Sequence, residues 1–197
     1  MIRNFALGVL LIFHAQAQAI NCRIASSPTE QAICKSRQLL ALDAHLNALY
    51  RSVKERAPSN KRMEDEQRNW IKLERDVCAN DACLQLAYQK RIDDLKIALT
   101  PWCQKQKAKI AGTWKRVGDA GPFNEFSAGP NHEFDSWLHQ RPEISGGTWT
   151  LDACNFSVQS GTGMTFDMVL LDMRETELRF FEYSVPGISR YKAIVNR

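Results

Sequence analysis

Three side chains that could perform acid–base chemistry recur at four-residue spacing: Asp135, His139 and Glu143. Histidine and carboxylate groups are the usual general acids and bases, because their pKa values can be brought near neutral pH. A solvated turn between two strands would carry the same residues. No motif of the chain supplies a base for a serine or cysteine nucleophile. We therefore expect that the protein is not an enzyme.

Metal and cofactor chemistry has little support in the sequence. It contains no Cys-x-x-Cys pair, and its four histidines are scattered, so no zinc site is expected. Gly161-Thr-Gly163 lacks the lysine and the following helix of a phosphate-binding loop, and we predict a turn there. We expect no metal and no cofactor.

The N-terminus has the pattern of a cleaved secretory signal. Arg3 supplies a positive charge, residues 5–13 form a short apolar core, and Ala17-Gln-Ala19 places small residues at the cleavage positions. The apolar core is too short to span a membrane, and Asn21 before Cys22 argues against a lipoprotein. We predict that residues 1–19 are removed. The mature chain, beginning near Ile20, would be a periplasmic or secreted bacterial protein without integral membrane association.

All six cysteines follow this segment. Exported proteins with an even number of cysteines usually carry disulfides, although six cysteines can pair in many ways. Local spacing favours Cys22–Cys34 and Cys78–Cys83, which leaves Cys103–Cys154 as a long-range bridge.

Residues 20–101 have the pattern of three amphipathic helices. The first begins at a capping box of Ser27 and Glu30 and ends near residue 57, the second runs from about 60 to 77, and the third ends at Thr100-Pro101. Short connections predict an antiparallel bundle. Apolar residues at three- and four-residue spacing would face inward: Ile33, Leu39, Leu42, Leu46, Leu49, Val53, Met63, Trp70, Leu73, Val77, Leu84, Tyr88, Ile92, Leu95 and Leu99.

Four polar residues could form a network inside this bundle: Asp43, Tyr50, Arg75 and Arg91. A carboxylate on the first helix that faces arginines on the other two could form a bidentate bridge. Alternatively, these residues pair separately or face water. We predict an internal network with a structural role.

The cysteine register resembles that of the LprI-type lysozyme-inhibitor family. The similarity covers about residues 22–99 and rests on Cys22, Glu30, Ile33-Cys34, Leu42-Asp43, Tyr50, Gln67, Trp70, Arg75, Cys78, Cys83-Leu84, Tyr88, Arg91-Ile92 and Leu95. It implies an exported helical domain and inhibition of lysozyme. The matched residues have mainly scaffold character. The named member of the family is a lipoprotein, whereas the sequence before Cys22 leads us to expect no lipoprotein here.

From residue 110 the pattern changes to short strands separated by turns. We expect strands near residues 112–114, 123–127, 134–138, 148–151, 156–158, 166–171, 178–183 and 191–195. Gly112-Thr-Trp114 shows a short similarity to lipocalin-like barrels. The sequence thus predicts an α+β protein: a disulfide-stapled three-helix bundle (20–101), a linker over residues 101–109, and a small antiparallel β-barrel or sandwich within residues 102–197.

Charge is divided between the two halves. Residues 20–116 contain 19 Lys and Arg against 11 Asp and Glu, whereas residues 117–185 contain 3 against 11. The basic run at 105–116 could contact anionic glycans or lipid, but a solvated linker explains it, and export argues against nucleic acid.

The acidic half suggests where a partner would bind. Glu133, Asp135 and Glu143, with Trp137 and His139 among them, lie in an expected turn from Ser127 to Ser145. An acidic surface would attract basic lysozymes, although an ordinary solvated exterior has the same composition. We expect a non-enzymatic inhibitor that occludes lysozyme or a related peptidoglycan hydrolase. The alternatives are a periplasmic binding or envelope-maintenance module with a small-ligand site in the β domain, and an immunity protein against a wall-degrading toxin.

Overall fold

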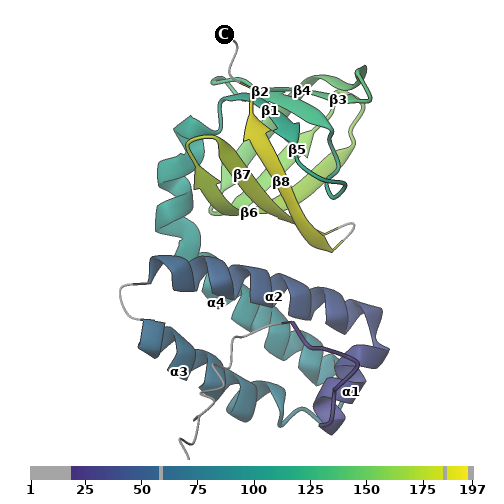
Figure 1. Cartoon of the computed structure of the whole chain (residues 1–197), viewed down its shortest axis with the longest axis vertical. Coiled ribbons are helices and arrows are strands. Elements are labelled where there is room, and N and C mark those ends of the chain that lie inside the picture. Colours follow the sequence, from purple (N-terminus) through teal and green to yellow (C-terminus); the bar gives the residue numbers. More distant parts are fainter. Residues whose placement is uncertain (1–18, 58–59, 184–185, 195–197) are drawn as a thin grey trace, which may run out of the picture.

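The computed structural model describes residues 19–57, 60–183 and 186–194, which form a helical part and a β-barrel stacked along the long axis of the molecule (Figure 1). The predicted signal segment, apart from Ala19, lies outside these residues. The α+β class and the order of its two parts agree with the sequence prediction. Within the described ranges, no helix has the length and apolar character needed to cross a membrane.

The described helical part contains the α-helices α1 Pro28–Lys35, α2 Arg37–Arg56, α3 Asn60–Trp70 and α4 Asp81–Gln106. α1 begins at the expected capping box: the Glu30 amide donates to Ser27 Oγ at 3.1 Å, and the Ser27 amide donates to Glu30 Oε2 at 3.3 Å. The predicted single first helix is broken at Ser36. Its extended backbone ends α1, and its Oγ caps α2 by accepting from the Leu39 amide at 3.3 Å.

A π-helical turn, η1 Ile71–Arg75, follows α3 directly. The prediction that Leu73 and Val77 face inward is wrong, because these side chains are 70% and 66% exposed. A π turn adds a residue to the helical repeat and so rotates the side chains that follow it about the helix axis. Arg75 is buried instead.

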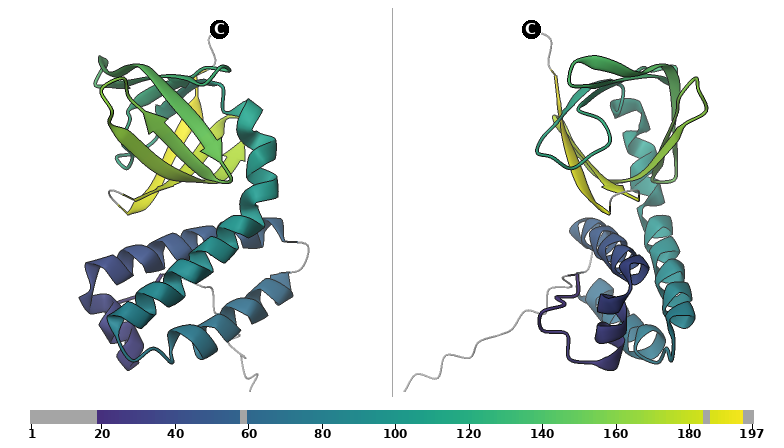
Figure 2. Two further views of the ribbon diagram at one scale, coloured as in Figure 1. Left: turned by 180° about the vertical axis from the view of Figure 1, so that it is seen from behind. Right: turned by 90° about the vertical axis from the view of Figure 1, so that its right-hand side faces the viewer.

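Helix α4 does not end at Thr100-Pro101, as predicted, but continues to Gln106 and into a short 3₁₀ turn, η2 Lys107–Lys109. Pro101 removes one helical hydrogen bond and disfavours a helix interior. The last turns of α4 nevertheless bury Leu99 and Cys103, and this packing offsets the loss. The expected linker is therefore helical, and α4 rises from the helical layer along the side of the barrel (Figure 2).

The eight strands of the second part are β1 Gly112–Arg116, β2 Glu125–Ala128, β3 Glu133–Leu138, β4 Arg141–Asp152, β5 Asn155–Gln159, β6 Thr165–Arg174, β7 Glu177–Glu182 and β8 Gly187–Ala193. Each strand pairs antiparallel with the next, and β8 pairs with β1. The β part is therefore a closed up-and-down barrel rather than a sandwich, an architecture that leaves no free sheet edge.

Aromatic side chains fill the barrel interior. Phe126 lies 5.5 Å from Phe134 and 5.0 Å from Tyr191 between ring centroids, and Phe156 lies 5.1 Å from Phe180. All five of these rings are fully buried. They follow the period-two alternation of the strands, which sends every second side chain inward.

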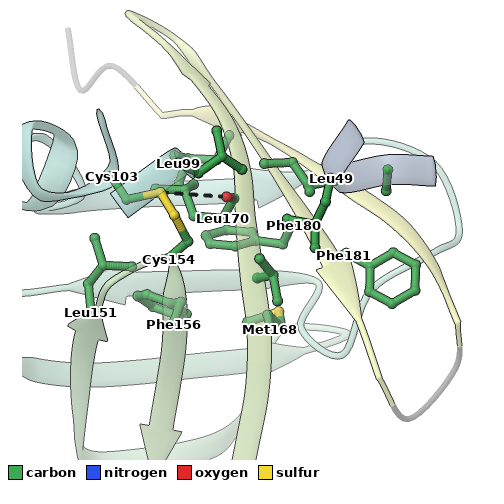
Figure 3. Packing of buried hydrophobic residues seen from close by; sticks show 14 of the residues in the cluster. Leu49, Leu99, Cys103, Leu151, Cys154, Phe156, Met168, Leu170, Phe180 and Phe181 are labelled. Carbon is green, nitrogen blue, oxygen red and sulfur yellow. Dashed lines mark hydrogen bonds between the residues drawn. A yellow bond between two sulfur atoms is a disulfide. The ribbon is translucent and has the colours of Figure 1, made fainter. Parts of the chain in front are cut away.

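Three disulfides join the predicted pairs, Cys22–Cys34, Cys78–Cys83 and Cys103–Cys154. The first holds the segment before α1 against that helix, and the second closes the turn before α4. The third connects α4 to the turn between β4 and β5, beside Leu170 of β6 (Figure 3).

Helices α2 and α4 pack on the barrel through a mixed apolar and polar junction. Leu49 and Leu99 lie over Leu170, Phe180 and the neighbouring strand residues (Figure 3). Next to this apolar layer, Ser52 Oγ donates to the Leu171 carbonyl, and Arg56 forms an ion pair with Asp172 at 2.6 Å.

A histidine at this junction carries no charge at neutral pH. His45 is 3% exposed and stacks on Phe181 with 4.5 Å between ring centroids. Burial, helped by the nearby Lys96, lowers the pKa of His45 to about 3. Desolvation disfavours the imidazolium form, and among the described residues no ion pair with an acid offsets this at His45.

We expect this histidine to make the protein less stable in acid. The unfolded chain binds a proton at His45 below about pH 6.5, whereas the folded chain stays neutral until about pH 3. The free energy of unfolding should therefore fall by about 1.4 kcal/mol for each unit by which the pH is lowered across this window. His45→Phe keeps the stack on Phe181 and should remove this dependence. Urea denaturation of both proteins at pH 7.5 and 4.5 measures this effect. If the two proteins lose the same free energy of unfolding between these pH values, His45 is not the cause of the acid sensitivity.

Candidate partner-binding surface

The five predicted partner-binding residues lie on the hairpin of β3 and β4. The expected long turn from Ser127 to Ser145 is wrong: the segment contains β3 and the start of β4, joined by only His139 and Gln140. These two residues have φ of 49° and 66°. Left-handed backbone at both central positions is what a tight two-residue hairpin turn requires.

Strand alternation places three of the five residues on one face. Phe134 and Ser136 point into the barrel and are fully buried, so Glu133, Asp135 and Trp137 lie on the outer face of β3. His139 is exposed at the tip, and Glu143 is exposed on β4.

Two shallow depressions flank the tip of this hairpin and meet at His139. One, of about 400 Å³, is lined by Trp137 together with Glu125 and Lys115. The other, of about 480 Å³, is lined by Leu138, Arg141, Pro142 and Glu143. The structure therefore places Trp137 and Glu143 on opposite sides of His139.

Two of the predicted acids also stabilise the hairpin itself. Asp135 Oδ1 accepts from the Gly146 amide at 2.9 Å. Glu133 accepts from the Asn131 amide at 3.0 Å and from Asn131 Nδ2 at 3.1 Å. Hydrogen bonds from its own backbone and from Asn131 lower the pKa of Glu133, which keeps it charged. Residues 125–152 contain five acidic residues and Arg141 as the single basic one, so this stretch of chain carries a net negative charge. Each depression at the tip is lined by one acidic and one basic side chain.

The predicted network around Asp43 is arranged differently from the expectation. The bidentate bridge to an arginine is not formed: Asp43 accepts from Tyr88 Oη at 2.9 Å and from the Ile20 amide at 2.8 Å. Arg75 donates to Asp76 at 2.8 Å, and Arg91 donates to Gln67 at 3.2 Å. Both arginines therefore have other partners, and the Asp43 carboxylate is held by a phenol and a backbone amide.

Sequence reasoning did not identify a groove in the helical part. It has a volume of about 660 Å³ and lies between the extended segment before α1 and the helical stretch of α3 and η1. Its charged lining is mixed, and Tyr50 of the predicted network forms part of its wall. The lining residues are Ala19, Ile20, Asn21, Ile24, Ala25, Ser26, Glu30, Tyr50, Glu64, Gln67, Arg68, Ile71, Arg75 and Asp76. They come from three distant stretches, so no local motif could reveal them.

The family model of the lysozyme inhibitor LprI matches residues 22–116, from the first cysteine through the helices to the end of β1. This stretch, just under half of the chain, is similar to the LprI family. It includes the groove lining from Ile24 onward and two complete disulfides. Ala19, Ile20 and Asn21 of the lining lie outside it, as does the β3–β4 hairpin.

Curated relatives agree with this assignment. Proteins named "Lipoprotein LprI" from Mycobacterium bovis and from two strains of Mycobacterium tuberculosis are 35% identical over 85 residues. The matched stretch is 41% of this chain and 42% of each relative, so the chain spans less than half the length of the curated relatives it matches. No solved structure is significantly similar to the chain.

Proposed function

We propose that this protein is an exported, non-enzymatic inhibitor of lysozyme or of a related peptidoglycan hydrolase. The observation that carries this proposal is the LprI match over residues 22–116. The three disulfides fit an oxidising compartment outside the cytoplasm. The predicted periplasmic or secreted location is part of the same proposal.

Within this function, the β3–β4 hairpin is the proposed contact. It combines a net acidic stretch of chain with an aromatic residue, Trp137, and an exposed tip at His139. Acidic residues around a contact attract a basic enzyme and raise the association rate. Tryptophan is among the residues that most often dominate binding energy at interfaces.

Occlusion is the mechanism that this geometry favours. A hairpin closed by a two-residue turn is narrow and held rigidly by its ladder hydrogen bonds, so little conformational entropy is lost when it binds in a cleft. The acids Glu133 and Asp135 are already held by Asn131 and Gly146. Binding would therefore not have to order them.

The alternative of a small ligand inside the β domain has weaker support. The buried rings of Phe126, Phe134, Phe156, Phe180 and Tyr191 occupy the volume that such a ligand would need. An immunity protein against a wall-degrading toxin would use the same surface, because the toxin would also be a peptidoglycan hydrolase.

The test is a cell-wall lysis assay with lysozymes of several types and the purified mature protein. We expect a dose-dependent slowing for at least one enzyme. Trp137→Ala and Glu143→Lys should each weaken inhibition by about tenfold, the size of a moderate interface effect. Glu175→Lys is the matched control. It makes the same charge change in the turn between β6 and β7, at the opposite end of the barrel.

The possible results of this assay test the proposed function and the proposed contact surface separately. If no lysozyme or related hydrolase is slowed at large molar excess, the proposed function is wrong. If inhibition is present but unaffected by both hairpin variants, the hairpin assignment is wrong. Loss of inhibition in Arg68→Glu, which alters the groove in the helical part, would then place the contact there.

A further inference from the structure

The backbone nitrogen of Ile20 contacts a buried carboxylate. It donates to Asp43 Oδ2 at 2.8 Å, and Tyr88 Oη of α4 donates to Oδ1 of the same side chain at 2.9 Å. Asp43 lies on α2 and is 4% exposed. The extended segment that carries Ile20 passes below α2 before it enters α1 (Figure 1).

Asp43 has no cation at contact distance among the described residues. None of their ion pairs includes it, and Arg75, whose charge acts on Asp43, donates its Nε to Asp76. Burial raises the pKa of Asp43, while the hydrogen bonds from Ile20 and Tyr88 act in the opposite direction. A carboxylate that is this fully buried rarely lacks a charged partner, because neutral hydrogen-bond donors offset only part of the free energy that it loses on desolvation.

The predicted cleavage after Ala19 would change the charge of one of these donors. Hydrolysis of the Ala19–Ile20 bond consumes one water, leaves a carboxylate on Ala19 and frees the nitrogen of Ile20, which takes up a proton at neutral pH. Ala19 is exposed, whereas the Ile20 side chain packs against the core. The new group would therefore stay in place after the cut.

We propose that Ile20 is the mature N-terminus and that its α-ammonium group is the counter-ion of Asp43. The nitrogen already lies at ion-pair distance from Oδ2. The two remaining N–H groups have room in the adjoining groove, whose lining begins at Ala19 and Ile20. Removal of the signal segment thus supplies the positive charge that pairs with buried Asp43 in the helical part. This pairing does not depend on whether the protein inhibits lysozyme.

The test compares two chains that differ by one residue. One is released from a fusion cut directly before Ile20, and the other retains Ala19, so that its Ile20 nitrogen stays a neutral amide. We expect the first chain to melt roughly 5 °C higher at pH 7, the shift that a partly buried ion pair gives in a protein of this size. The same two chains with Asp43→Asn should differ by less than about 1 °C.

The pH dependence distinguishes charge from shape. Pairing with Asp43 should raise the pKa of the α-amino group above its ordinary value near 8. The extra stability should therefore be complete below about pH 8 and disappear as the pH rises through the raised pKa. Tyr88 of α4 and Arg75 of η1, the other titratable groups that act on Asp43, keep their protons over this range.

Two further measurements make the proposal falsifiable even if Asp43→Asn fails to fold. Intact mass of the exported protein should give Ile20 as its first residue. The α-amine of the folded chain should react with an acylating reagent at least tenfold more slowly than that of the unfolded chain. A different N-terminus, equal melting temperatures of the two chains, or equal reactivity would each overturn the proposal.

Discussion

Removing the Cys103–Cys154 disulfide should lower the free energy of unfolding by about 4 kcal/mol. The bridge closes a loop of sequence separation 51, and in the chain-entropy model the stabilisation grows with the length of the closed loop. Both cysteines are fully buried, so Cys103→Ala with Cys154→Ala leaves no polar group behind. Urea denaturation of the oxidised wild type and the double variant measures the difference.

The matched control is the double variant Cys22→Ala with Cys34→Ala. Its bridge closes a loop of sequence separation 12, for which the same model gives about 3 kcal/mol. The long bridge also fastens α4 to the barrel beside Leu170, so its loss should loosen the junction as well. A smaller loss for the long bridge than for the short one would contradict this account.

The features that the sequence predicts correctly depend on local chemistry. Ser27 and Glu30 form a capping box because both partners lie within one helical turn. Cys22–Cys34 and Cys78–Cys83 close short loops. Once these pairs form, Cys103–Cys154 is the only bridge left among the six cysteines. The barrel strands follow from alternating burial, as at Phe134 and Ser136.

The features that the sequence does not predict depend on tertiary context. Pro101 indicates a helix end by its local chemistry, but packing of Leu99 and Cys103 against the barrel carries α4 past it. The π turn at η1 has no local signal, and it moves Leu73 to the surface and Arg75 to the inside. Local propensity is overridden wherever burial of a large apolar face favours a different backbone.

The candidate site illustrates the same limit. The order of Glu133, Asp135 and Trp137 on β3 follows from strand period, so their common outer face is predictable. The partner of Asp43 is not, because charge pairing favours an arginine whereas the carboxylate bonds to Tyr88 and to a backbone nitrogen. Reasoning from side-chain types does not consider backbone donors. The Ile20 nitrogen lies 23 positions before Asp43, so no local pattern in the sequence indicates this contact.

Replacing Asp172 should have the second large effect, about 3 kcal/mol or more of unfolding free energy. This carboxylate is 7% exposed on β6, and it pairs with Arg56 of α2 at 2.6 Å, Arg174 at 3.2 Å and Arg179 at 3.7 Å. Asp172→Asn keeps the shape but leaves three guanidinium groups without their shared acid. Arg56 is the most affected, since burial already lowers its pKa.

Two companion variants identify the cause of this loss. Arg174→Gln removes a partner that is 71% exposed and should lower stability by less than about 1 kcal/mol. Arg56→Met combined with Asp172→Leu replaces the buried pair by apolar groups and should recover most of the stability lost in Asp172→Asn. Urea denaturation of the three proteins gives the comparison. A loss in Asp172→Asn no larger than in Arg174→Gln would show that the pair does not hold α2 on the barrel.

The Arg56–Asp172 ion pair lies where α2 and α4 meet the barrel, so its loss should loosen a specific contact. Arg56 also donates to the Ser52 carbonyl at 2.6 Å and lies 3.8 Å from the Trp102 ring centroid, so one guanidinium joins α2, α4 and β6. The Cys103–Cys154 bridge fastens α4 alone, because α2 has no covalent link to the barrel. Asp172→Asn should therefore release α2 while α4 stays attached. Faster hydrogen exchange confined to the C-terminal turns of α2 is the expected signature, and exchange that rises equally in α4 would contradict it.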